Sequence, residues 1–195
     1  YTESKEEIAM SLNTLGLAHD FMRRMVQPGA KCIDATAGKG RDTMLLCQLA
    51  GESGHVLAFD IQVDAIRQTE ERLAQEGLTN ATLILDSHSN MAQYAEPESI
   101  DCIVFNFGRL PGGDPSIFTT AETSIPAVTA GLQLLKPGGV MSLSIYYGGP
   151  NGYAERDRLL EFLQTIDDRE ASVLVSTWHN RPNDPPISVF VWKNR

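Results

Sequence analysis

The stretch that decides the fold is residues 31–43, which read KCIDATAGKGRDT. Its first residues, Lys31 to Asp34, are typical of a short buried strand, and the small residues from Ala35 to Gly40 indicate a loop. A helix is then expected from Asp42 to Ala50, ended by Gly51. A strand, a glycine-bearing loop and a helix in this order form the first unit of an α/β fold.

The same alternation continues along the chain. Helices are predicted from about Val63 to Glu76, in the segment that ends near Leu134, and near Tyr153 to Leu163. Further strands are expected at residues 55–60, 81–85, 100–105, 140–146, 171–178 and 187–192. The last two leave no room for a helix between them and should form an antiparallel hairpin. Together the elements predict five βα units in a doubly wound, mostly parallel seven-stranded sheet with a reversed edge strand.

An amphipathic helix is expected before this pattern. It begins with Ser4 and Glu7 in capping-box spacing, and apolar residues follow at near-helical intervals up to Met25. We find no internal repeat, low-complexity tract or linker that would divide the chain. We therefore expect a single domain over residues 1–195, with an extra N-terminal helix beside the sheet.

The composition excludes several classes of protein. The chain has 195 residues, 42% of them hydrophobic, and its 16 Lys and Arg against 25 Asp and Glu give a net charge of −9. This balance argues against a general nucleic-acid coat but is compatible with a local basic patch. No apolar run approaches a membrane span, and a cytoplasmic protein is expected. The widely spaced Cys32, Cys47 and Cys102 suit reduced core thiols better than disulfides or a metal site, so no metal is expected.

The loop after the first strand is the first candidate for a ligand site, because doubly wound sheets bind ligands beyond the carboxyl ends of their strands. Gly38 and Gly40 allow a ligand to approach the backbone, and the next helix offers free N–H groups. The P-loop pattern is absent, and Thr43 replaces the third glycine of the dinucleotide pattern. The acidic strand end Asp34 with this loop resembles the first motif of class I S-adenosylmethionine (SAM) methyltransferases. An ordinary strand-to-helix turn is the alternative.

Polar residues at two further strand ends support a nucleoside site. Asp60 ends the second strand, where a carboxylate can bind a ribose diol or cap the next helix. Gln62 could contact the same nucleoside or stay exposed in the first helical turn. Ser87 and His88 follow Asp86 at the end of the third strand, where such folds hold the adenine edge. A polar loop with a helix cap is the alternative there.

Three stretches together point to a narrower family: residues 34–43 (DATAGKGRDT), 106–114 (NFGRLPGGD) and 183–186 (NDPP). They resemble the small bacterial proteins of the YtqB-like or MnmM family, long labelled rRNA methylases. The resemblance covers nearly the whole chain. It implies a Rossmann-like class I fold and a SAM-dependent enzyme that methylates the amine of 5-aminomethyl-2-thiouridine at the tRNA wobble position. The family pattern has Asn at position 39, Tyr at 109 and often His at 147.

The resemblance also implies a cofactor pocket. Its expected members are Asp34, Gly38, Lys39, Gly40, Asp42, Asp60, Gln62, Ser87 and His88. Asp42 could pair with the ammonium group of SAM and Lys39 with its carboxylate. The alternative for Asp42 is a favourable interaction with the dipole of its own helix.

Asn106, Asp114 and Tyr146 are the candidate catalytic residues. Asn106 follows the fourth strand, where its side-chain carbonyl could accept a hydrogen bond from the substrate amine and orient its lone pair. Asp114 or His88 could remove a proton from that amine. Tyr146 and Tyr147 could stack on an extruded base or pack at the sheet edge.

The candidate substrate-binding residues are Arg109, Tyr147 and Arg181. Arg109 and Arg181 are candidate phosphate contacts that would allow an acidic chain to bind tRNA transiently. His19 is expected near the first loop, as a pocket wall or as a histidine with its hydrogen bonds satisfied. The alternatives are a methyltransferase for rRNA or a small metabolite, and a non-catalytic SAM-binding module. Monomer and homodimer both stay open.

Overall fold

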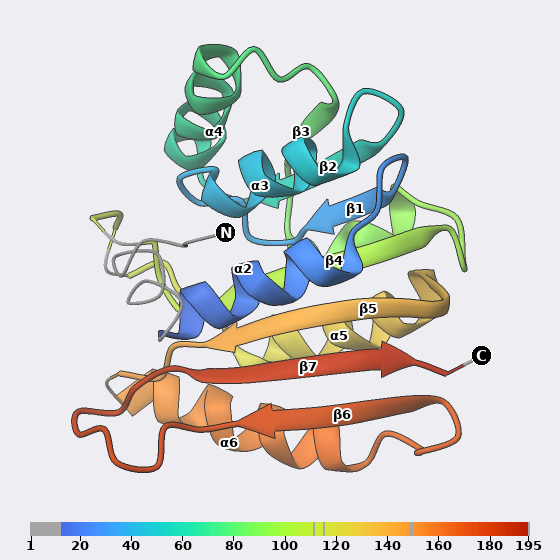
Figure 1. The fold of residues 1–195 in the computed structure, drawn as a ribbon. Coiled ribbons are helices and arrows are strands. Elements are labelled where there is room, and N and C mark those ends of the chain that lie inside the picture. The colour runs from blue at the N-terminus through green and yellow to red at the C-terminus, as the bar shows by residue number, and fades with distance from the viewer. Residues whose placement is uncertain (1–12, 111, 115, 149, 195) are drawn as a thin grey trace, which may run out of the picture.

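The computed structural model describes residues 13–110, 112–114, 116–148 and 150–194, which form a seven-stranded sheet with helices on both faces (Figure 1). The strands are β1 (Lys31–Asp34), β2 (His55–Asp60), β3 (Ala81–Leu85), β4 (Ile100–Phe107), β5 (Leu135–Ile145), β6 (Ala171–Ser176) and β7 (Ile187–Lys193). The helices are α2 (Thr14–Met25), α3 (Arg41–Ala50), α4 (Val63–Gln75), α5 (Ala121–Leu134) and α6 (Pro150–Gln164), with a 3-10 helix η1 (His88–Gln93). Ser4 and Glu7, the expected start of the first helix, lie outside the described residues.

The order of the strands is β3-β2-β1-β4-β5-β7-β6. Strands β1 to β5 are parallel, whereas β7 is antiparallel to both β5 and β6. The predicted fold class and the antiparallel hairpin are therefore confirmed, but the prediction of a reversed edge strand is wrong. The reversed strand β7 is buried from Ile187 to Val191 and lies inside the sheet, while the half-exposed β6 forms the edge. A strand with continuous apolar residues is best covered on both faces, which favours the interior position.

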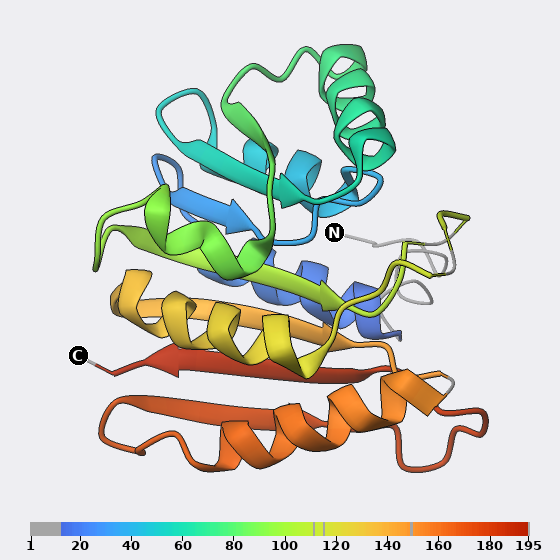
Figure 2. The ribbon, with the colours of Figure 1, turned by 180° about the vertical axis from the view of Figure 1, so that it is seen from behind.

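Two hydrophobic cores hold the helices to the sheet. Helices α2, α3 and α4 cover one face, with Met22, Leu46 and Val56 in the core beneath them. Figure 2 shows α5 and α6 on the opposite face, where Leu143 and Leu159 belong to the second core. The sheet is thus covered on both faces, as a mostly parallel sheet requires.

Three connections differ from the sequence prediction. Strand β4 continues to Phe107 because Asn106 and Phe107 still pair with β5. Strand β5 starts at Leu135, which pairs with Ile100 before the register shifts and pairing resumes at Val140. The segment between β3 and β4 holds only η1, so the expectation of five βα units fails at this position.

The topology brings the motif loop and Asn106 together. Strands β1 and β4 are neighbours, but β2 lies on the far side of β1 and β5 on the far side of β4. The loops that follow β1 and β4 therefore diverge at this point of the sheet and leave a crevice between them. Residues 35–40 and Asn106 lie on either side of this switch point.

The cysteines are buried and free, as predicted. Burial raises the pKa of the Cys32 and Cys47 thiols to about 12. Within the described ranges, no group of three or more His, Cys, Asp or Glu side chains is arranged to hold a metal ion. The helices in those ranges are also too short or too polar to cross a membrane.

Candidate active site

The loop after β1 is held by the buried carboxylate of Asp34. Its Oδ1 accepts a hydrogen bond from the amide of Thr36 at 3.1 Å, and its Oδ2 accepts one from the hydroxyl of Thr43 at 2.6 Å. Burial and the nearby charge of Asp42 raise the pKa of Asp34 above its usual range. Asp34 therefore ties the loop to the first turn of α3, and any contact with a cofactor stays a prediction.

The same loop is joined to the end of β2 by Asp60. The amide of Gly38 donates to Asp60 Oδ2 at 3.0 Å, and the amide of Gln62 donates to Oδ1 at 2.9 Å. Burial raises the pKa of Asp60. Gln62, not Asp60, is the N-cap residue of α4. The carboxylate thus joins the loop after β1 to the start of α4; it is not among the described lining residues of the cavity, and its contact with a ribose stays a prediction.

Gly40 is required by the turn into α3. Its φ is +74°, and a Cβ at this position would lie 2.9 Å from the Cα of Thr69. A residue with a side chain would meet both backbone strain and the wall of α4. The close approach of the loop to α4 therefore depends on this glycine.

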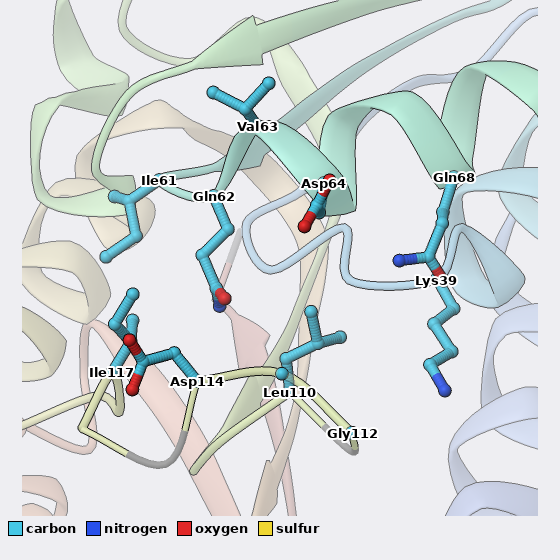
Figure 3. Close-up of a pocket in the computed structure, with 11 residues that line it drawn as sticks. Lys39, Ile61, Gln62, Val63, Asp64, Gln68, Leu110, Gly112, Asp114 and Ile117 are labelled. Atoms are coloured by element: carbon cyan, nitrogen blue, oxygen red, sulfur yellow. The ribbon is translucent and has the colours of Figure 1, made fainter.

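A cavity of about 590 Å³ opens beside this loop (Figure 3). Lys39 borders it from the loop after β1, Gln62 from the start of α4, and Leu110, Gly112 and Asp114 from the loop after β4. In Figure 3, Gln62 points toward the loop that carries Leu110 and Asp114, and Lys39 lies at the other end. The volume and the mixture of apolar and charged walls are typical of a site for a small molecule.

A second group of side chains surrounds Asp42 on the first turn of α3. This carboxylate is 6% exposed and lies 2.6 Å from His19 Nε2 through Oδ1. Its Oδ2 accepts a hydrogen bond of 2.7 Å from Asn106 Nδ2. The amide of Asn106 donates to the Thr36 hydroxyl at 2.7 Å, so the residue is fixed at both its backbone and its side chain. His19 has its hydrogen bond satisfied, as one of the two sequence interpretations expected.

Asn106 is therefore oriented by its neighbours. Because its NH₂ group donates to Asp42, the amide oxygen is the atom through which Asn106 can accept a hydrogen bond from a ligand. Burial, and to a smaller extent the nearby charge of Asp42, raises the pKa of the Tyr146 phenol after β5. The phenol stays protonated at neutral pH and can donate a hydrogen bond.

The two tyrosines after β5 lie in different environments. Tyr146 is 40% exposed, whereas Tyr147 is 9% exposed and lies beneath the guanidinium of Arg156, whose Cζ is 4.7 Å from the ring centroid. The burial of Tyr147 favours packing over direct stacking on a base. The exposed ring of Tyr146 leaves both interpretations open.

The loop from Gly108 to Thr119 is anchored by Glu155 of α6, which is 3% exposed. Its carboxylate accepts hydrogen bonds from Thr119, at 2.8 Å, and from Ser124. The hydroxyl of Thr119 accepts from the amide of Gly108 at 2.7 Å. Burial raises the pKa of Glu155. The end of β4, and with it Asn106, is therefore supported from α6.

Asp114 and His88, the candidate proton acceptors, differ in position. Asp114 borders the cavity and accepts two hydrogen bonds from Ser116, which hold the pKa of Asp114 below its usual range. His88 is buried against Phe107, and burial lowers its pKa to about 4. Its Nε2 has no hydrogen-bond partner among the described residues. Both shifts weaken these groups as bases at neutral pH.

Ser87 and His88 stand apart from the cavity, since neither is among its described lining residues. Ser87 caps η1 by accepting a hydrogen bond from the amide of Ser89, as the alternative interpretation of this segment expected. Their contact with an adenine edge stays a prediction.

The two candidate phosphate contacts lie on exposed loops. Arg109 follows β4 and is exposed. The guanidinium of Arg181 lies 3.7 Å from the ring centroid of Trp178 in the loop between β6 and β7. Asp184 of the same loop accepts a hydrogen bond from Tyr153 of α6. The Asn-Asp-Pro-Pro stretch therefore connects α6 to the hairpin.

Sequence reasoning missed three residues near the site: Glu155, Thr119 and Trp178. Glu155 lies among charged residues in α6, and no signal in the sequence separates it from its exposed neighbours. Trp178 was expected as the last residue of the strand 171–178, but β6 ends at Ser176 and the indole of Trp178 donates a hydrogen bond to Thr14, a residue distant in the sequence.

The residues present fit a SAM-sized cofactor. Gly38 and Gly40 let the backbone of the motif loop pack closely against its neighbours, of which Leu110 and Thr69 are the nearest. The carboxylate of Asp60 lies at the end of β2 beside this loop, and Lys39 supplies a positive charge at one end of the cavity. An acceptor for hydroxyls, a cation for a carboxylate and close backbone approach are what a nucleoside-linked amino acid requires.

Comparison with known proteins agrees with this geometry. The family model described as "Putative rRNA methylase" matches residues 56–192. The "tRNA (mnm(5)s(2)U34)-methyltransferase, chloroplastic" of Arabidopsis thaliana is 34% identical over 194 residues, which cover 91% of this chain and 68% of that protein. The crystal structure of a "putative rRNA-methylase" from Clostridium thermocellum superposes with a TM-score of 0.91 at 41% identity, covering 93% of this chain and 97% of the other.

A third relative bears on the cofactor. The crystal structure of a "putative methyltransferase" from Streptococcus mutans, in complex with SAH, superposes with a TM-score of 0.84 at 34% identity and covers 93% of this chain and 98% of the other. SAH is what SAM becomes after it has given up its methyl group. The chain belongs to the family described as "Putative rRNA methylase" and is a SAM-dependent methyltransferase of class I fold.

Proposed function

We propose that this protein transfers a methyl group from SAM to the exocyclic amine of a modified wobble uridine in tRNA. The substrate is suggested by the Arabidopsis relative, whose name specifies a 5-methylaminomethyl-2-thiouridine at position 34. The corresponding acceptor is the 5-aminomethyl nucleoside, a primary amine. A cytoplasmic location is part of the same proposal.

The observation that carries the proposal is the fixed orientation of Asn106. Its side-chain NH₂ is held by Asp42 at 2.7 Å and its backbone amide by Thr36 at 2.7 Å. The amide oxygen then accepts one N–H of the substrate amine and directs the nitrogen lone pair toward the methyl group. Alignment of the reacting atoms is the main contribution a protein can make to such a displacement.

Bound SAM supplies an activated methyl group on a sulfonium sulfur. Asp60 at the end of β2 would accept hydrogen bonds from the ribose, and Lys39 at one end of the cavity would pair with the carboxylate. Asp42 can attract the ammonium group through the lone pairs that His19 and Asn106 leave available. The Asp42 carboxylate would then link the cofactor to Asn106, the residue that orients the substrate amine.

The amine must lose a proton to attack the methyl carbon. The lowered pKa values of Asp114 and His88 make both weak bases, and Tyr146 keeps its own proton. We therefore propose that the neutral form of the amine enters from solution and that the proton released after transfer leaves to water. On this basis the rate should rise with pH up to the pKa of the substrate amine.

The experiment that tests the proposal incubates the protein with SAM and with tRNA from cells in which the wobble amine is unmethylated. Nucleoside mass spectrometry is expected to show one added methyl group on the aminomethyl uridine, and calorimetry should show binding of SAM. If SAM binds but the methyl group is transferred only to rRNA or to a small metabolite, the tRNA substrate proposed here is wrong and that molecule takes its place. SAM binding with no transfer to any RNA or metabolite would support a non-catalytic module.

A further inference from the structure

A group of aromatic and arginine side chains lies outside the cavity, on segments far apart in the sequence. Tyr147 follows β5, Tyr153 and Arg156 belong to the first half of α6, and Trp178 and Arg181 belong to the loop between β6 and β7. Figures 1 and 2 both show the end of β5, the start of α6 and this loop at the same end of the sheet. Asn106 and Tyr146 end their strands at that edge too. We name Tyr147, Tyr153, Arg156, Trp178 and Arg181 the stacking surface.

The stacking surface consists of guanidinium groups laid on rings. The Cζ of Arg156 lies 4.7 Å from the ring centroid of Tyr147 and 5.0 Å from that of Tyr153. The two rings are 5.8 Å apart in an edge-to-face arrangement. The Cζ of Arg181 lies 3.7 Å from the ring centroid of Trp178. Both arginines therefore present flat cationic groups supported by aromatic rings.

Hydrogen bonds fix the rings of this surface. Trp178 Nε1 donates to the hydroxyl of Thr14 at 3.2 Å, and that hydroxyl donates to the carbonyl of Pro186 at 2.9 Å. Tyr153 donates to Asp184 across from α6 to the hairpin loop. A surface whose rings are already ordered loses little conformational entropy when a flat ligand stacks on it.

The charge of the surface indicates the kind of ligand. Arg156 is paired with Asp157 at 2.6 Å, and Asp184 lies beside Tyr153, so acidic groups offset part of the positive charge. In a chain of net charge −9, such a surface cannot bind a long phosphate backbone by charge alone. Flat rings and guanidinium planes are instead suited to unpaired bases, with a phosphate as a secondary contact.

We infer that the stacking surface binds the unpaired nucleotides that flank the methylated nucleotide of a single-stranded RNA loop. This inference rests on the proposed function, because it places the rest of the RNA beside the nucleotide that enters the site. Strand β5 lies between β4 and β7, so the exposed Tyr146 at the end of β5 comes between Asn106 and the loop that carries Trp178. Specificity then comes from the pocket, and affinity from stacking outside it.

The test compares ring removal with ring retention. Trp178→Ala and Tyr153→Ala remove a ring, whereas Trp178→Phe and Tyr153→Phe keep it and lose only the hydrogen bonds to Thr14 and Asp184. The probes are a fluorescent oligouridylate for binding and unmethylated tRNA for transfer kinetics. A third test variant, Arg156→Ala, removes the guanidinium that lies on two rings. Its control is Arg169→Ala, since Arg169 is an exposed arginine in the loop before β6, at the other end of the sheet.

Trp178→Ala, Tyr153→Ala and Arg156→Ala should each weaken RNA binding and raise the KM for tRNA by roughly 5- to 150-fold, the range for loss of one base stack. The phenylalanine variants and Arg169→Ala should remain close to the wild type, and SAM affinity by calorimetry should not change. Equal losses in the alanine and phenylalanine variants would overturn the inference, because they would show a structural role. Unchanged RNA affinity in the alanine variants would overturn it too, and would be expected if the surface binds a protein.

The inference and the proposed function can fail separately. A wild-type protein that methylates tRNA while Trp178→Ala, Tyr153→Ala and Arg156→Ala all keep its KM would overturn the stacking surface alone. A wild-type protein that binds oligouridylate through these rings but methylates no wobble amine would leave the surface standing and overturn the proposed function. A wild-type protein with no affinity for either RNA would overturn both.

Discussion

The two partners of Asp42 allow a structural contribution to be separated from a catalytic one. Asn106→Ala removes the group 2.7 Å from Oδ2, and His19→Ala removes the group 2.6 Å from Oδ1. Either change leaves a carboxylate that is 6% exposed with one hydrogen bond fewer. A hydrogen bond to a charged group contributes about 1.5–3 kcal/mol, so urea unfolding should show a similar loss of stability in both variants.

Methyl transfer should distinguish the two variants. Only Asn106 is placed to orient the substrate amine, and misalignment of reacting atoms typically lowers kcat about 100-fold. At saturating SAM we expect that loss in Asn106→Ala, while the kcat of His19→Ala stays close to that of the wild type. Calorimetry with SAM is the control for the pocket. Equal losses of kcat in the two variants would refute the reasoning, because Asn106 would then act only by holding Asp42.

Three further changes test other parts of the site. Asp60→Asn should weaken SAM binding about 10- to 150-fold in calorimetry, the equivalent of one charge-assisted hydrogen bond, and unchanged affinity would remove Asp60 from the cofactor site. The pKa of Glu155 is raised above its ordinary value of 4.5. The protonated side chain therefore stabilises the folded state fully at a pH below 4.5, and this contribution is lost as the pH rises through the raised pKa. In urea unfolding, the free energy of unfolding of Glu155→Gln should therefore rise relative to that of the wild type as the pH increases over that window. A difference between the two proteins that does not change with pH would contradict this. Gly40→Ala should lose at least about 1–3 kcal/mol of stability in the same assay, because φ is +74° and the new Cβ would lie 2.9 Å from Thr69 Cα; a variant as stable as the wild type would show that the turn can rearrange.

Local patterns in the sequence were enough to predict most strands and the motif loop. The strand from His55 to Asp60 was predicted with its observed ends, because an apolar run there is bounded by Gly54 and by a polar turn. The antiparallel hairpin followed from the short spacing between its strands. These features depend on residues close together in the chain.

Features set by contacts between distant residues were not predictable. The position of β7 inside the sheet depends on whether β5 pairs with β6 or with β7, and the spacing of a hairpin does not decide this. The role of Glu155 depends on which side of α6 faces Thr119 and Ser124, from segments more than 30 positions away. The meeting of Trp178 with Thr14 spans nearly the whole chain.

The candidate site was predicted in part for the same reason. Gly38 and Asp60 were correctly placed at adjacent strand ends, since parallel strands bring their carboxyl ends to one edge. The bond between Asp42 and Asn106 was not foreseen, although both residues were named, because it requires the register of α3 against β4. The structure thus adds to the sequence the hydrogen bond that links the first turn of α3 to Asn106 at the end of β4.

The most direct test of the account is the modified-nucleoside profile of tRNA from cells that lack this gene. The account predicts that the methylated aminomethyl uridine disappears, that the unmethylated amine accumulates, and that the wild-type gene but not Asn106→Ala restores the methylated form. A tRNA profile that is identical with and without the gene would contradict the account.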